Sequence, residues 1–88
     1  MEIKFTSKFA KLYNKAPRKI KNSFDFRLGI FIKNKYERRM NNHHSSGRYE
    51  GFRSINVTGD WRAVFREFNN GEVIYFDLLG THSKLYKK

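Results

Sequence analysis

Apolar residues recur at helical spacing through the first half of the chain, after a short alternating start. Residues 2–5 alternate polar and apolar positions, which predicts a strand. Thr6 or Ser7 then suits a helix N-cap, because either hydroxyl can accept a hydrogen bond from a free backbone N–H. Pro17 suits the first turn of a second helix, expected to run to about Glu37. The helical stripe of the first helix contains Phe9, Leu12 and Tyr13. That of the second helix contains Ile20, Phe24, Leu28, Phe31, Lys35 and Tyr36.

The second half changes to short runs that are typical of strands. Residues 38–48 (RRMNNHHSSGR) show no periodicity and are expected to form a loop. Turn signals follow at 58–60 (Thr-Gly-Asp) and 69–71 (Asn-Asn-Gly). They divide residues 49–80 into three strands, which predicts a small antiparallel sheet.

The register of the first hairpin follows from the need to segregate polar from apolar side chains. A three-residue loop places Val57 opposite Trp61 and Ile55 opposite Ala63, on the face that the helices cover. On the last strand the core face is expected to carry Ile74, Phe76 and Leu78. The other face is expected to be open and lined by Ser54, Asn56, Arg62, Arg66, Tyr75 and Asp77.

These elements predict a single α+β domain over residues 1–88. A short strand and a two-helix hairpin (1–37) pack on the sheet (49–80), and a polar tail (81–88) follows. With no cysteine, fifteen aromatic residues (one Trp, five Tyr and nine Phe) must supply much of the core. No apolar run approaches the roughly 18 residues of a membrane span, and no signal peptide is visible, so we expect a cytoplasmic protein.

The charge of the chain indicates a polyanionic partner. Nineteen Lys and Arg against eight Asp and Glu give a formal net charge of +11, more than solubility requires. The basic stretch 15–21 is either a solvated face or a contact for RNA or the ribosome. Phe26 and Ile30 lie off the helical stripe, where they pack on the first helix or are covered by a partner.

Candidate chemistry concentrates in the loop, the hairpin and the tail. His82 can transfer protons near neutral pH, and the guanidinium of Arg62 matches the geometry of a phosphate. Tyr86 adds a hydroxyl and a stacking ring. His43 and His44 would need a third ligand to bind a metal well, so we expect no metal and no cofactor.

Residues 53–65 (RSINVTGDWRAVF) and 80–86 (GTHSKLY) resemble the RelE/ParE superfamily of bacterial toxins from type II toxin–antitoxin systems. The likeness is greatest to the mRNA-interferase branch around RelE, YoeB and YafQ, with its microbial RNase-like fold, and it covers nearly the whole chain. It implies metal-independent cleavage of mRNA on the translating ribosome, by attack of the ribose 2′-hydroxyl on the adjacent phosphate. It also implies an acidic antitoxin as the partner protein.

The resemblance also implies roles for individual residues. His82 takes the place of a residue near the scissile phosphate and is the expected acid for the leaving 5′-oxygen. Arg62 matches an arginine aimed at the phosphate, and Tyr86 matches an aromatic that holds or protonates the substrate. Asp60 matches an acid of YafQ-like members, and His43 matches their histidine in an HxLxG stretch, which here reads HHSSG. His43 is therefore the expected base.

One strand departs from the family pattern. Ser54 and Asn56 stand where YafQ-like members carry an acid and a histidine, and neither can act as an acid or base near pH 7. A catalytically weak or degenerate member that binds RNA therefore remains an alternative function. A ParE-like toxin that inhibits a protein such as DNA gyrase is a further alternative, which the His82/Tyr86 pair argues against. RNA contacts are expected from Arg53, Ser54, Asn56, Asp60, Arg66 and Lys84.

Overall fold

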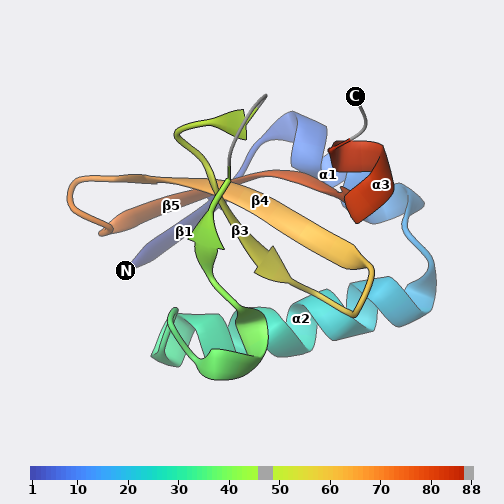
Figure 1. The fold of residues 1–88 in the computed structure, drawn as a ribbon, viewed down its shortest axis with the longest axis horizontal. Helices are drawn as coiled ribbons and strands as arrows, with labels where there is room; N and C mark the ends of the chain where they lie inside the picture. Colours follow the sequence, from blue (N-terminus) through green and yellow to red (C-terminus); the bar gives the residue numbers. More distant parts are fainter. Residues whose placement is uncertain (46–48, 87–88) are drawn as a thin grey trace.

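The fold is a five-stranded mixed sheet with helices on both faces, which confirms the α+β class. The computed structural model describes residues 1–45 and 49–86. In Figure 1 the sheet crosses the centre, with α2 along its lower side and α3 beside the C-terminus. The elements in chain order are β1 (Glu2–Phe5), α1 (Ser7–Lys15), α2 (Arg18–Lys33), a 3-10 turn (Arg38–Met40), β2 (His43–His44), β3 (Arg53–Asn56), β4 (Trp61–Phe68), β5 (Val73–Thr81) and α3 (His82–Leu85).

The sheet order is β1-β5-β4-β3-β2, and one edge differs from the predicted antiparallel sheet. β1 pairs with β5 in parallel at one edge of the sheet. After β1, the helices α1 and α2 lead the chain to the opposite edge, where β2 and β3 lie. The predicted register of the first hairpin is confirmed, since Ile55 pairs with Ala63 and Val57 N donates to Trp61 O at 2.8 Å. At the second turn Asn69, Asn70 and Gly71 all have positive φ, the conformation that Asn and Gly tolerate best.

The helices begin where the caps predict, but α2 ends early. Thr6 Oγ1 accepts a hydrogen bond from Phe9 N at 3.0 Å, which makes Thr6 the N-cap of α1. The expected end of α2 near Glu37 is wrong, because the helix ends at Lys33. Lys35 leaves the helix and its ammonium pairs with Glu67 of β4 at 2.7 Å. None of the described helices is long and apolar enough to cross a membrane.

The main core fills the space between the sheet and the two long helices. The Phe76 ring lies at its centre, with centroid distances of 5.3 to 5.9 Å to five other phenylalanine rings. Ile30 packs against this core, whereas Phe26 is 63% exposed. The buried members are Phe9, Ala16, Ile20, Phe24, Phe31, Met40, Ile55, Val57, Ala63, Phe65, Ile74, Phe76 and Leu79.

Phe76→Ala should lower the free energy of unfolding by about 3–5 kcal/mol, because it opens a cavity that its ring neighbours cannot collapse into. Phe26→Ala is the matched control, since the exposed ring should change that free energy by less than about 0.5 kcal/mol. Urea unfolding followed by tryptophan fluorescence measures both. Equal losses in the two variants would contradict the assignment of Phe76 to the core.

A second, smaller core lies on the opposite face of the sheet. It contains Val64, Leu78 and Leu85, so the prediction that Leu78 shares the main core is wrong. Val64 pairs with Leu78 but Phe65 pairs with Phe76, which leaves Asp77 as an extra residue on β5. Such a bulge reverses the alternation of side chains beyond it. Leu78 therefore packs under α3, and part of the face expected to be open is covered.

The predicted loop 38–48 contains regular structure in its described part. Its first residues form the 3-10 turn, and His43 and His44 form β2, which pairs with β3 at the sheet edge. Residues 46–48 lie outside the described residues. The prediction of an irregular loop over 38–45 is therefore wrong, because pairing with a strand that follows in the sequence orders β2.

Candidate functional site

A polar cavity of about 280 Å³ brings the tail, the hairpin and β2 together. All four residues predicted to be catalytic contribute to its walls, although they come from three separate segments. The cavity lies on the face of the sheet that α3 partly covers. It is lined by His43, His44, Ser45, Ser54, Arg62, His82 and Tyr86.

His82 is the first residue of α3, and its backbone fixes where the imidazole lies. Its N–H donates to Asp60 O at 2.8 Å, which ties α3 to the turn of the first hairpin. The ring is exposed and lies 4.9 Å from the Tyr86 ring, centroid to centroid. Gly80 allows this arrangement, since a Cβ there would lie 3.3 Å from Leu85 Cδ2. The His82 imidazole thus lies in the cavity wall beside Tyr86.

Tyr86 closes the side of the cavity next to His82. Its hydroxyl lies 3.1 Å from Ser45 Oγ, and its ring meets the Tyr49 ring edge-on at 5.4 Å. Ser45 is buried beside β2, and nothing in the sequence marked it or Tyr49 as part of a site. These contacts hold the Tyr86 ring and hydroxyl in place.

Arg62 presents a guanidinium that is anchored on one side only. Its Nη1 donates to the backbone oxygens of Thr58 at 3.2 Å, Gly59 at 3.1 Å and Trp61 at 3.2 Å. Among the described residues no carboxylate forms an ion pair with it. Its positive charge and its remaining donors are therefore available to a phosphate.

Hydrogen bonds hold the two adjacent histidines in the same tautomer, with the proton on Nδ1. His43 Nδ1 lies 2.6 Å from Asn41 O, and a carbonyl oxygen can only accept, so Nδ1 carries the proton. In the neutral ring this tautomer leaves a lone pair on His43 Nε2, as a general base requires. His44 Nε2 lies 2.9 Å from Arg53 Nη1, which can only donate, so the proton of His44 is on Nδ1.

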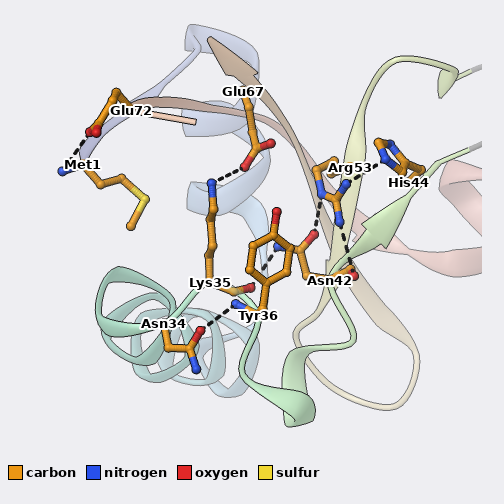
Figure 2. A network of polar contacts seen from close by, with 9 residues as sticks. All are labelled: Met1, Asn34, Lys35, Tyr36, Asn42, His44, Arg53, Glu67 and Glu72. Atoms are coloured by element: carbon orange, nitrogen blue, oxygen red, sulfur yellow. Dashed lines mark hydrogen bonds and ion pairs between the residues drawn. The ribbon is translucent and has the colours of Figure 1, made fainter. Parts of the chain in front are cut away.

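Arg53 does not line the cavity, and Figure 2 shows its guanidinium next to Asn42 and His44. Its Nε donates to Asn42 Oδ1 at 2.7 Å, while Nη1 binds His44. Its guanidinium lies 5.6 Å from the centre of the Tyr36 ring. Asn42 Nδ2 donates to Lys35 O at 2.9 Å, which continues the network toward α2. In this arrangement Arg53 orients Asn42 and His44.

Ser54 and Asn56 are less accessible than predicted, and Ser54 pairs with Val64, a member of the second core. Ser54 is 0% exposed and Asn56 is half-buried, so the expectation that both line an open face is wrong. Ser54 Oγ and Asn56 Oδ1 have no hydrogen-bond partner among the described residues. A buried oxygen without a partner is unfavourable, so the Ser54 hydroxyl in the cavity wall suits a ligand oxygen.

The other predicted RNA contacts lie outside the cavity wall. Asp60 is exposed and reaches the site through its backbone oxygen, and Lys84 is exposed on α3. Arg66 is also exposed, and its guanidinium lies over the rings of Phe52 and Phe68. Among residues 1–45 and 49–86, no three His, Cys, Asp or Glu side chains are grouped so as to hold a metal ion.

Solved structures with the same fold include bacterial toxins. YafQ from E. coli strain BL21(DE3) is similar, with 19% identity, 97% of each chain covered and a TM-score of 0.79. A structure of the E. coli DinJ–YafQ toxin–antitoxin complex matches at 20% identity, with 97% of this chain and 96% of that chain covered and a TM-score of 0.77. The YoeB/ParE toxin from Agrobacterium tumefaciens matches at 14% identity, with 93% and 99% covered and a TM-score of 0.75.

At these identities the structural likeness shows the fold, and the sequence family comes from a separate comparison. A search of the curated proteins found no match. The family model described as "Bacterial toxin of type II toxin-antitoxin system, YafQ" matches residues 1–87, which is nearly the whole chain. The chain therefore belongs to the YafQ family of toxins from bacterial type II toxin–antitoxin systems.

Proposed function

We propose that this toxin is an endoribonuclease that cleaves mRNA on the translating ribosome, with the polar cavity as its active site. The observation that carries the proposal is the meeting of His43, Arg62, His82 and Tyr86 around one cavity. His43 supplies a lone pair and Arg62 a cation. His82 supplies a second imidazole, and Tyr86 supplies an aromatic ring. RNA cleavage through the 2′-hydroxyl uses a base, a cation and an acid, and an aromatic ring can hold the neighbouring nucleotide.

The proposed reaction assigns a role to each of three of these groups. His43 Nε2 removes the proton from the ribose 2′-hydroxyl, and the 2′-oxygen attacks the adjacent phosphorus. Arg62 stabilises the negative charge of the phosphorane through charge-assisted hydrogen bonds. Protonated His82 gives its proton to the 5′-oxygen as the P–O5′ bond breaks. The products are a 2′,3′-cyclic phosphate and a free 5′-hydroxyl.

Tyr86 and Ser54 complete the proposed site without transferring protons. The Tyr86 ring, held next to His82, stacks on the nucleotide beside the scissile phosphate. The Ser54 hydroxyl, which has no hydrogen-bond partner among the described residues, donates to a phosphate or ribose oxygen. Its position on β3, where the family carries an acid, leaves this chain with fewer catalytic groups. The ribosome therefore supplies part of the substrate alignment.

Ribosome-bound mRNA should be cut much faster than the same mRNA free in solution. Alignment of reacting groups contributes a large share of catalysis, and this site has few groups of its own to provide it. Primer extension on one mRNA, incubated with the purified toxin in the presence and absence of translating ribosomes, measures the difference. Equal cleavage of both would exclude ribosome dependence, and inhibition of DNA supercoiling without any cleavage would favour the gyrase-type alternative.

The partners follow from the family and the charge. We propose a cognate acidic antitoxin that neutralises this basic protein, as well as the ribosome and its mRNA as targets. The site of action is then the cytoplasm, where translation occurs. The DinJ–YafQ complex is an example of such a pairing in a toxin of similar fold.

A further inference from the structure

We propose that single-stranded RNA beside the cleavage site lies along a track of aromatic rings that leads away from the cavity over the sheet. This inference rests on the proposed function and assigns a role to residues outside the cavity. The track contains six aromatic side chains and one arginine. Its members, from the cavity outward, are His82, Tyr86, Tyr49, Phe52, Arg66, Phe68 and Tyr75.

Successive members of the track are in contact along its whole length. His82 and Tyr86 are 4.9 Å apart, Tyr86 and Tyr49 are 5.4 Å apart, and Tyr49 and Phe52 are 6.3 Å apart, all between ring centres. The Arg66 guanidinium bridges the next gap, 4.9 Å from the Phe52 ring and 5.5 Å from the Phe68 ring. Tyr75 then meets Phe68 edge-on at 5.7 Å.

The sheet explains why the track points into the cavity. Arg62, Val64 and Arg66 alternate with core residues along β4, so they share the face opposite α1 and α2. Arg66 lies about 13 Å from Arg62 along the strand. Among the described residues, α3 packs on this face through Leu85, against Val64 and Leu78. A strand of RNA can thus extend from the cavity along β4.

The inner and outer parts of the track differ in exposure. Tyr49, Phe52 and Tyr86 pack against the second core, where burial accounts for their rings. Phe68 is 42% exposed and Arg66 is exposed, and burial does not account for either side chain. The outer part is therefore the portion that is most exposed and whose side chains burial does not explain.

The chemistry of the outer part favours nucleotides. Unstacked bases bind on aromatic faces and on arginine planes largely independently of sequence, and a nearby cation neutralises the backbone. Arg66 forms no ion pair with any described carboxylate, whereas Lys4, the pairing neighbour of Tyr75, is bound to Glu2 at 3.0 Å. Arg66 is thus the cation available to a phosphate at this end of the track.

Binding of RNA without cleavage tests the track directly. The probe is a short, fluorescein-labelled single-stranded RNA with every 2′-hydroxyl methylated, which removes the attacking group. Phe68→Ala should raise the Kd by roughly 5- to 100-fold, the usual range for loss of one stacked base. Arg66→Lys should also weaken binding although the charge is kept, because lysine lacks the planar guanidinium. Ile32→Ala, at a half-exposed apolar residue of α2, should leave the Kd unchanged.

The outcomes separate this inference from the proposed function. Wild-type affinity in folded Phe68→Ala and Arg66→Lys variants would overturn the track even if mRNA is cleaved. Unchanged RNA affinity with weakened binding of the acidic antitoxin would also overturn it, because the surface would then serve a protein partner. Loss of RNA affinity in these variants, in a toxin that cleaves no mRNA, would support the track and refute the proposed cleavage. Thermal unfolding of each variant checks the fold.

Discussion

His82→Ala is expected to reduce cleavage of ribosome-bound mRNA by roughly 10²- to 10⁴-fold, the usual contribution of a general acid. The variant loses the group proposed to protonate the 5′-oxygen as the P–O5′ bond breaks. The fold should persist, because the imidazole is exposed and the hydrogen bond that anchors α3 comes from the backbone N–H of this residue to Asp60 O. Single-turnover cleavage on stalled ribosomes, read by primer extension, measures the rate.

The neighbouring residue provides a matched control for His82. Ser83 is exposed on the same turn of α3, and its described side-chain contact is a weak one to Thr81 at 3.5 Å. Ser83→Ala should therefore cleave at the wild-type rate and unfold at the wild-type temperature. A folded His82→Ala variant with undiminished cleavage would remove this residue from the mechanism.

Arg62→Ala is expected to reduce the same cleavage rate by roughly 10²- to 10³-fold, the range seen when one donor to a developing oxyanion is removed. The backbone oxygens that now bind Nη1 lie in the hairpin turn and can be solvated, so the variant should fold. Arg62→Lys should recover part of the rate, because it restores the charge without the fork of donors. The rate constant under single-turnover conditions distinguishes lost chemistry from weaker ribosome binding.

Arg38→Ala is the matched control for the loss of one positive charge. Arg38 is exposed on the 3-10 turn, away from the cavity wall, and its removal lowers the net charge by the same amount. Equal loss of cleavage in Arg38→Ala and Arg62→Ala would show that net charge alone accounts for the effect. If the folded His82 and Arg62 variants both keep full toxicity, the nuclease proposal fails, and DNA supercoiling becomes the activity to measure.

Much of this architecture was predictable from local patterns in the sequence. Thr6 marks the start of α1 through its side-chain cap, and the separation of polar from apolar positions predicts the pairing of Ile55 with Ala63. Resemblance to known toxins selected His43, Arg62, His82 and Tyr86, which the fold brings to one cavity. Periodicity and motifs are short-range signals, so they locate elements and candidate residues.

The remaining features depend on contacts between distant segments. Pairing with β3 makes a strand of His43 and His44, and the ion pair of Lys35 with Glu67 accompanies the early end of α2. The bulge at Asp77 becomes visible only when β4 and β5 are aligned, and it moves Leu78 to the opposite face.

Tertiary structure also decided which site residues are buried and which histidine nitrogens carry a proton. The sequence contains Ser54 and two adjacent histidines. Whether the serine hydroxyl is buried depends on the segments that pack around β3. The histidine tautomers follow from Asn41 O and the Arg53 guanidinium, which approach only after the edge of the sheet has formed. Local sequence determined which chemical groups this protein has, and long-range packing decided which of them meet, because hydrogen bonds and burial depend on neighbours in space.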